Sequence, residues 1–300
     1  MKENINKSNM NPDNLLINNK SILMMGIINA TTDSFSGDGI YSDKNKFDIL
    51  KTCQSMIDAG VEIIDVGGES TRPKSMYNQV VEISEDEEIE RVIPLIKTIR
   101  KNFKIPISID SKKIKVIKEA IKEGANLVND ISMLEDENLI ELLRKHDIYY
   151  VLTHYRKDGK HTKIMSEMLK DLNDKLNILT SNGIKREKII LDPGIGFGKK
   201  YFHSAEVLSK INLLKKAFNL PVMVGASRKS FIGEYIDKDV NERIFGTAAT
   251  VAYSIMMGAN IVRVHDYKEM IDVKKITETL IELSKKEWVL LINHILYSYL

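Results

Sequence analysis

Eight short apolar segments alternate with longer amphipathic stretches between residues 22 and 266, and this alternation restricts the folds open to the chain. The apolar segments span 22–29, 62–68, 106–110, 127–130, 149–154, 189–194, 222–227 and 261–266. Between them, apolar residues recur with helical spacing, as in 89–96 and 114–121. Because the short segments are apolar enough to be buried on both faces, the pattern predicts an α/β fold, a single-domain (β/α)8 TIM barrel.

Chain length leaves other architectures open. A chain of 300 residues forms one large barrel as readily as two smaller domains. A doubly wound open sheet is the rival, although no Gly-x-Gly-x-x-Gly turn of its dinucleotide-binding form follows the first strand. We expect a flexible N-terminal arm at 1–20, a barrel at 21–286 and an apolar C-terminal extension at 287–300. The extension would pack on the barrel or on a second subunit.

Charge and cysteine content narrow the class of partner. Lys and Arg number 44 against 42 Asp and Glu, a balance that favours a small-molecule partner over nucleic acid. Cys53 stands alone, which argues against disulfides and cysteine metal clusters and favours a buried thiol. No apolar run approaches the roughly 20 residues of a membrane span, and the N-terminus is polar. We therefore expect a cytoplasmic protein without membrane contact.

Polar residues follow the apolar segments at their C-terminal ends. They are Asn29, Asp65, Asp110, Asn129, Asp130, His154, Asp192, Ser227, Arg263 and His265, with Lys229 nearby. In (β/α)8 barrels these strand ends meet at one face, where the active site lies. Each Asp or Asn has a second explanation, because both residue types also cap helices and open turns. Arg263 and His265 lie two apart on one face of a strand, so we expect an anion beside them.

Glycine- and serine-containing loops follow several strands, as in "DVGGESTRP", "LDPGIGFGKK" and "GASRKS". Glycine lets backbone amides approach a ligand closely, so these loops are expected to line a pocket. The segment "TTDSFSGDGIYSD" has the composition of a mobile lid or of an ordinary connection.

Seven motifs, in order from Gly26 to Asp266, resemble those of dihydropteroate synthase, a pterin-binding family. They are "GIINATTDSFS", "IIDVGGESTRP", "SIDS", "LVNDIS", "LDPGIGFGK", "GASRKSFIG" and "VRVHD". The resemblance implies a transferase of folate biosynthesis, which joins 6-hydroxymethyl-7,8-dihydropterin pyrophosphate to p-aminobenzoate and releases pyrophosphate. It also implies Mg²⁺ as cofactor, a homodimer formed through late barrel helices, and sulfonamides as inhibitors.

The resemblance further assigns site residues. It implies contacts to the pterin from Asp110, Asn129, Asp192 and Lys229. It also implies contacts to the pyrophosphate from Asn29, Thr71, Arg72, Arg263 and His265, with Asn29 as the metal ligand. For the p-aminobenzoate pocket it implies Phe35, Ser36, Thr71, Pro73, Phe197 and Ser230. The residues implied in catalysis are Asp110, Lys229, Asp33 and Arg72.

Three departures from the family pattern bear on affinity. Thr32 stands where the family has proline, Thr153 where it has methionine, and the second loop differs at 74–83. We expect them to affect p-aminobenzoate more than pterin. Two alternatives stay open: a pterin-binding methyltransferase-type barrel and a pterin-binding paralogue without synthase activity. Both lid loops and the Arg263–His265 pair argue against the methyltransferase, because a methyl donor carries no pyrophosphate.

Overall fold

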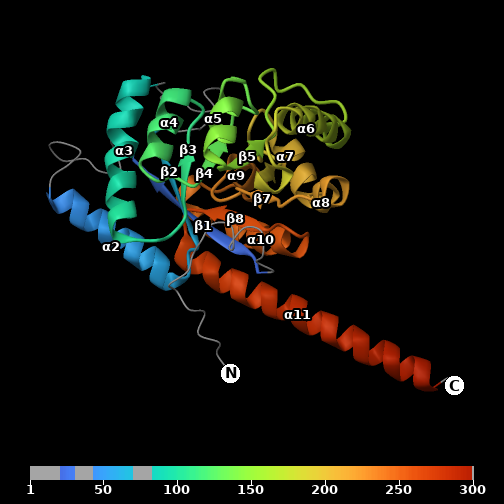
Figure 1. Cartoon of the computed structure of the whole chain (residues 1–300). Coiled ribbons are helices and arrows are strands. Elements are labelled where there is room, and N and C mark those ends of the chain that lie inside the picture. Colours follow the sequence, from blue (N-terminus) through green and yellow to red (C-terminus); the bar gives the residue numbers. More distant parts are fainter. Residues whose placement is uncertain (1–20, 31–42, 70–82, 299–300) are drawn as a thin grey trace.

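Eight parallel strands lie at the centre of the protein and helices surround them (Figure 1). The computed structural model describes residues 21–30, 43–69 and 83–298, with side chains described at 21–30, 48–69 and 83–285. The strands are β1 Leu23–Asn29, β2 Ile63–Gly67, β3 Ile107–Asp110, β4 Leu127–Asp130, β5 Tyr149–Thr153, β6 Ile189–Asp192, β7 Met223–Val224 and β8 Ile261–Val264.

Helices follow the strands along the chain. They are α2 Asp43–Ala59, α3 Glu85–Asn102, α4 Ile114–Lys122, α5 Leu139–His146, α6 Ile164–Ser181, α7 Tyr201–Ser209, α8 Asn212–Phe218, α9 Ser230–Ile236, α10 Ile244–Met256 and α11 Tyr267–Ser298. Short 3-10 turns, η2 Arg186–Lys188 and η3 Val240–Glu242, precede β6 and α10. The strand and helix alternation expected from the sequence is thus confirmed.

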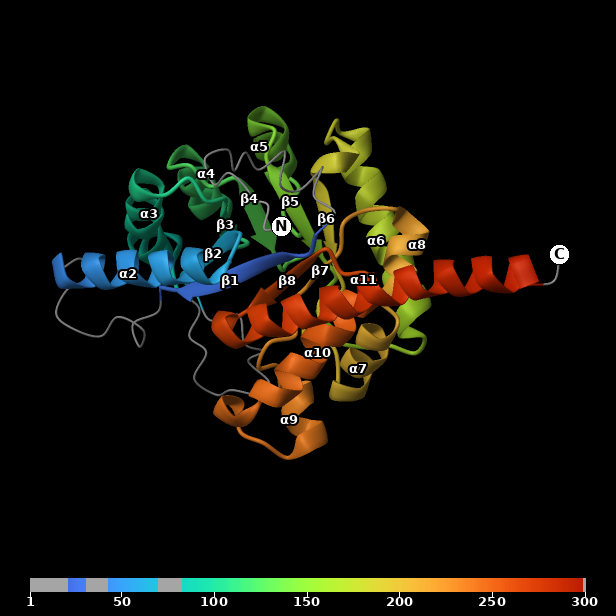
Figure 2. The ribbon, with the colours of Figure 1, turned by 90° about the horizontal axis from the view of Figure 1, so that it is seen from below.

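The sheet closes on itself. The strand order is β6-β5-β4-β3-β2-β1-β8-β7, and its two ends meet where Leu191 of β6 bridges Val222, just before β7. Across this seam the Leu191 amide donates to the Pro221 carbonyl at 2.9 Å. Seen from below, the helices lie around the strands (Figure 2). A ring of parallel strands with outer helices confirms the predicted TIM barrel and rules out the open doubly wound sheet.

Apolar side chains fill two separate spaces, one inside the ring and one between strands and helices. The inner cluster consists of Leu23, Met25, Ile63, Leu127, Tyr149, Val151, Ile190, Met223 and Ile261. In the outer one, α3 buries Val92 and Ile96, which confirms the helical spacing predicted at 89–96. Cys53 of α2 is also buried there, and burial raises the pKa of its thiol to about 12. The predicted buried thiol is therefore confirmed.

Two elements differ in length from the sequence expectation. The strand expected at 222–227 keeps ladder pairing only at Met223–Val224, because the chain soon turns at Arg228, which has a positive φ of 57°. Helix α11 continues without a break through the boundary expected between residues 286 and 287. In Figures 1 and 2 its C-terminal part extends beyond the barrel.

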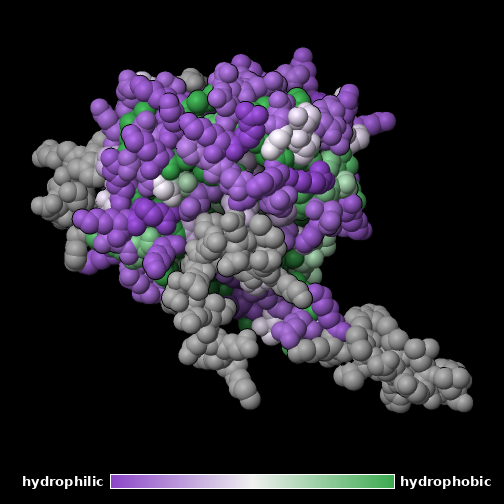
Figure 3. All heavy atoms as spheres, in the orientation of Figure 1, coloured by the Kyte–Doolittle hydropathy of each residue, from purple (hydrophilic) through white to green (hydrophobic). Residues whose placement is uncertain are grey.

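The face of the molecule seen in Figure 3 is mostly hydrophilic, with apolar residues in small separate patches. Within the described ranges, no helix combines the length and the apolar character that crossing a bilayer requires.

Asp130, at the end of β4, holds a turn. Its Oδ1 accepts from the Ser132 amide at 2.7 Å, and its Oδ2 accepts from the Leu134 amide at 3.0 Å and the Tyr150 hydroxyl at 2.8 Å. Asp130 is buried, and its neighbour Asn129 belongs to the opposite face of the strand, because successive side chains alternate. For this strand-end aspartate, the turn explanation is therefore the right one.

We predict that Asp130→Ala lowers the free energy of unfolding by about 3 kcal/mol, because it leaves a buried hydroxyl and two amides without their acceptor. Tyr150→Phe removes one of these hydrogen bonds and should cost only about 1 kcal/mol. Urea unfolding followed by circular dichroism measures both values. Equal losses in the two variants would contradict this account of the turn.

Candidate active site

A layer of polar side chains lies on top of the apolar layer inside the barrel. Five residues of the inner apolar cluster are each followed, two positions later in the same strand, by a polar residue. These polar residues are Asp65, Asn129, Thr153, Asp192 and Arg263. Alternate residues of a strand face the same side. Two residues further along each of these strands, toward its C-terminal end, the inward-facing side chain is therefore polar instead of apolar. These five polar residues thus lie on the inner face of the barrel, whereas, of the others expected at one mouth, Asp130 holds a turn and the His154 ring contacts Asp171 of α6.

Arg263 of β8 binds two carboxylates across the barrel. Its Nε donates to Asp65 Oδ2 of β2 at 2.6 Å, and its Nη2 donates to Asp110 Oδ2 of β3 at 2.5 Å. The side chain of Asp65 is fully buried, and those of Asp110 and Arg263 are 5% and 12% exposed. The negative charge expected beside Arg263 is thus supplied in part by two carboxylates of the protein itself. The sequence identifies Asp65 as a strand-end residue but does not indicate its pairing with Arg263.

Burial and mutual charge shift the protonation of this group. Burial raises the pKa of Asp110 to about 7, although Arg263 lowers it, and Asp65 adds to the rise. Burial tends to lower the pKa of Arg263, but the Asp65 and Asp110 carboxylates raise it above its usual value. The guanidinium therefore stays charged while Asp110 exchanges its proton near neutral pH.

Asp192 and Lys229 interact through their opposite charges. Burial raises the pKa of Asp192, and the Gly194 amide, which donates to its Oδ1 at 2.7 Å, opposes the rise. Burial and then Arg263 lower the pKa of Lys229 to about 8. Burial thus disfavours the charged form of both groups, and a ligand that pairs with them would offset this effect.

His265 contributes a neutral ring. Its backbone amide and its Nδ1 both lie near Ser227 Oγ, at 3.2 and 3.1 Å. Burial, followed by the charges of Arg263 and Arg228, lowers the pKa of His265 to about 3. Arg263 of β8 and His265, just after it, therefore supply one full positive charge and one neutral imidazole, instead of two cations.

Several acceptors in the polar layer have no hydrogen-bond partner among the described residues. They are Asp65 Oδ1, Ser108 Oγ, Asp110 Oδ1, Asn129 Oδ1 and Thr153 Oγ1. Asn129 does use its Nδ2, which donates weakly to Asp65 Oδ2 at 3.4 Å. A buried polar atom left unpaired costs about 1–3 kcal/mol, so such a group marks a place where a ligand supplies the missing donors.

Phe197 and Lys229 meet beside this layer. Lys229 Nζ lies 3.9 Å from the centroid of the Phe197 ring, within the range of a cation–π contact. Gly196 has a φ of 80°, which disfavours any other residue, and a Cβ there would stand only 3.2 Å from Lys229 Cδ, so the loop backbone packs closely against this lysine. Ser230 follows Lys229 as the first residue of α9. Of the residues expected at p-aminobenzoate, Phe197 and Ser230 are described, and Lys229, expected at the pterin, connects their two segments through its contact with Phe197.

Asn29, at the end of β1, lies beside Gly67 of β2 in the strand register. A Cβ on Gly67 would stand 3.8 Å from Asn29 Oδ1 and 3.7 Å from Asp110 Oδ2, so both oxygens flank that glycine. No cluster of three or more His, Cys, Asp or Glu able to hold a metal occurs in the described ranges. This donor set fits Mg²⁺ held by one or two protein oxygens together with substrate phosphates, and does not fit an all-protein cage.

Not all expected site residues fall within the described structure. Outside it lie Asp33, Phe35, Ser36, Thr71, Arg72 and Pro73, together with the departures Thr32 and 74–82. Thr153, the remaining departure, is buried next to Asp192 in the ladder. It therefore brings a hydroxyl into the polar layer where the family pattern has an apolar side chain.

Comparisons with known proteins point to one activity. Residues 25–265 match the family model described as pterin binding enzyme. A dihydropteroate synthase of Clostridium beijerinckii is 43% identical over 86% of this chain and 94% of its own length. A crystal structure of the Clostridium difficile enzyme in the presence of pteroic acid superposes with a TM-score of 0.81, at 38% identity over 87% of this chain and 97% of that one. A Yersinia pestis dihydropteroate synthase with a sulfonamide drug complex gives 0.78, at 34% identity over 87% and 95%.

We predict that the Asp110 carboxyl titrates with a midpoint near 7 in the ligand-free protein, as burial of its charged form requires. Carbon-13 NMR of aspartate-labelled protein measures this, with the Asp110→Asn spectrum giving the assignment. The midpoint should fall in Asp65→Asn, because a second negative charge no longer opposes ionisation. A wild-type midpoint at or below 4 would contradict the charge arrangement.

Proposed function

The chain belongs to the pterin binding enzyme family, as a dihydropteroate synthase of folate biosynthesis, and from this premise we propose how its residues divide between the substrates. The pterin ring occupies the polar layer, the pyrophosphate lies by β8, and p-aminobenzoate lies against the loops after β6 and β7. Two bacterial relatives, at 43% and 37% identity, are dihydropteroate synthases, and the methyltransferase alternative is not favoured.

The observation that carries this proposal is the set of unpaired acceptors in the polar layer. A pterin edge presents ring N–H and amino donors next to a carbonyl acceptor, and Asp110 Oδ1 and Asn129 Oδ1 are buried acceptors without a described partner. Asp192 is held by the Gly194 amide through one oxygen, which orients the other toward the ligand side. Lys229 supplies the complementary donor. Pterin binding therefore satisfies groups whose burial otherwise destabilises the protein.

The pyrophosphate is assigned to Arg263, His265 and Asn29. Two of the five N–H groups of Arg263 hold Asp65 and Asp110, and the remaining three are suited to phosphate oxygens. His265 can donate from its Nε2 while Ser227 engages its Nδ1. Asn29 Oδ1 is the protein ligand we propose for Mg²⁺, and the ion when bound would neutralise charge on the leaving group.

The reaction exchanges one bond for another at the exocyclic carbon of the pterin. The bond from carbon to the pyrophosphate oxygen breaks, the amine of p-aminobenzoate forms a carbon–nitrogen bond, and the amine then releases one proton. Positive charge grows on the carbon as pyrophosphate leaves, and an ionised Asp110 stabilises it while Arg263 stabilises the departing anion. An arylamine is already unprotonated at neutral pH, so the protein mainly has to position it.

The p-aminobenzoate pocket is assigned to Phe197, Lys229 and Ser230, together with the expected residues outside the described structure. The contact between Lys229 Nζ and the Phe197 ring supports this assignment, because it forms an apolar wall with a cation at its edge. Sulfonamides resemble p-aminobenzoate, and the Yersinia pestis relative is described with a sulfonamide drug complex. We propose the same class of inhibitor for this protein.

We propose a homodimer through the late barrel helices. Helices α7, α9 and α10 contact one another and lie on the same side of the barrel in Figure 2. They carry the exposed apolar side chains Tyr201, Phe202, Tyr235, Ile236, Phe245, Tyr253 and Met256. Phe245 is 84% exposed, an arrangement that favours burial against a second copy.

The direct test of function is formation of 7,8-dihydropteroate and pyrophosphate from the two substrates with Mg²⁺. For the pterin site, we predict that Asp192→Ala weakens pterin binding about tenfold to a hundredfold, because ring donors lose their acceptor inside a closed pocket. Calorimetric titration with a pterin measures the affinity. Asp174→Ala, on the exposed face of α6, is the matched control and should bind normally. Unchanged affinity in Asp192→Ala would overturn the pterin assignment.

A further inference from the structure

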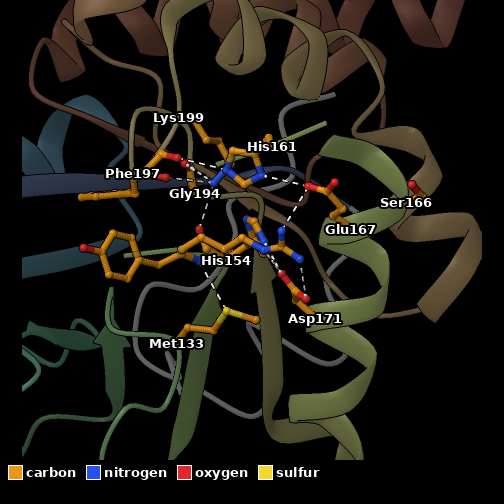
Figure 4. A network of polar contacts seen from close by, with 12 residues as sticks. Met133, His154, His161, Ser166, Glu167, Asp171, Gly194, Phe197 and Lys199 are labelled. Carbon is orange, nitrogen blue, oxygen red and sulfur yellow. Dashed lines mark hydrogen bonds and ion pairs between the residues drawn. The ribbon is translucent and has the colours of Figure 1, made fainter. Parts of the chain in front are cut away.

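Lys199 places its ammonium group in a cage of backbone carbonyls. Its Nζ donates to the carbonyls of His154 and Gly194, both at 3.0 Å, and of Phe197 at 3.1 Å (Figure 4). Lys199 is only 5% exposed, and no carboxylate among the described residues lies within ion-pair distance of it. All three N–H groups of the ammonium are therefore directed at main-chain oxygens.

The cage joins two loops at the mouth of the barrel. His154 follows β5, whereas Gly194 and Phe197 belong to the loop between β6 and α7. The two backbones pack so closely that a Cβ on Gly194 would stand 2.0 Å from the His154 carbonyl oxygen. Gly194 also has a positive φ of 66°, so no other residue fits there easily. Lys199 thus connects the segment after β5 to the loop after β6 at a point where their backbones are in direct contact.

The β5 side of the cage is rigidly anchored. Arg156 donates to both carboxylate oxygens of Asp171 on α6, at 2.6 and 3.0 Å, and to Glu167 Oε2 at 3.1 Å. Asp171 also contacts His154 Nε2 at 3.2 Å. His154 is itself fully buried. Its carbonyl is therefore a fixed point against which the Lys199 ammonium holds the neighbouring loop (Figure 4).

A second contact holds the same loop further along. His161 Nε2 lies 3.0 Å from the Gly198 carbonyl oxygen, and a Cβ on Gly198 would meet the Arg156 carbonyl at 2.2 Å. The backbone around Phe197 is thus fixed on both sides, at Gly194 through Lys199 and at Gly198 through His161. Phe197 has little freedom to move away from Lys229.

We propose that Lys199 is a positioning residue for the second substrate: by holding the Phe197 carbonyl, it fixes the aromatic wall that p-aminobenzoate packs against. This inference rests on the proposed assignment of Phe197 to the p-aminobenzoate pocket. Lys199 makes no hydrogen bond or ion pair with the pterin-facing groups Asp110, Asn129 and Asp192. It holds the Phe197 carbonyl directly, whereas it influences Asp192 only through its charge and through the Gly194 backbone. Its loss should therefore affect the two substrates unequally.

The test compares Lys199→Met with Lys200→Met, a neighbouring exposed lysine on the same loop. Lys199→Met should raise KM for p-aminobenzoate at least tenfold at saturating pterin pyrophosphate, while the calorimetric affinity for the pterin changes less than twofold. Lys200→Met should leave both values unchanged. A lysine that only stabilised the fold would lower the unfolding temperature without separating the substrates. An unchanged KM, or equal losses for both substrates, overturns the proposal.

Two further variants keep the result decisive. Lys199→Arg retains the charge but replaces a compact ammonium with a planar fork, so it should show the same separation if Lys199→Met fails to fold. If Lys199→Arg affects both substrates equally or neither of them, the proposal is also overturned. Phe197→Ala tests the underlying assignment, because it should raise KM for p-aminobenzoate by itself. If Phe197→Ala leaves that KM unchanged, the pocket assignment fails independently of Lys199.

Discussion

A buried guanidinium shared by two carboxylates is the interaction on which the mouth of this barrel depends. Arg263 joins β8 to β2 through Asp65 and to β3 through Asp110. Removing one partner of a buried ion pair typically costs about 3–5 kcal/mol, because the other charge is left uncompensated. The polar layer is therefore held by a few strong contacts, where the layer below it is held by apolar packing.

The same guanidinium connects stability with chemistry. Arg263 holds Asp110 through its Nη2, and in the proposed reaction this contact keeps Asp110 close to the reacting carbon while the remaining N–H groups of Arg263 face the leaving group. A carboxylate and a cation that are preorganised in this way need not reorganise when charge separates in the transition state. The cost is visible in Asp110, whose pKa of about 7 reflects a charge that burial disfavours. Functional groups are often kept at such a cost to stability.

Sequence alone predicted the barrel, because the fold follows from local periodicity, whereas the roles of the site residues came from the family resemblance and stay predictions. Apolar strands alternating with helices gave the fold, and polar strand ends gave the mouth. The neutral state of His265 could not be predicted, since it depends on burial and on Arg228 and Arg263 nearby. Lys199 was equally hidden: it stands next to Lys200 in the sequence, and only the packing of two loops buries one lysine and exposes the other.

The central claim is that Arg263 serves both its carboxylate partners and the pyrophosphate. Product inhibition of Arg263→Lys by pyrophosphate tests this most directly, because lysine keeps the charge and loses the planar set of donors. The account predicts that the inhibition constant for pyrophosphate rises about tenfold or more and that synthase activity falls with it. An unchanged inhibition constant, with only a lower unfolding temperature, would show that Arg263 serves the barrel's structure alone.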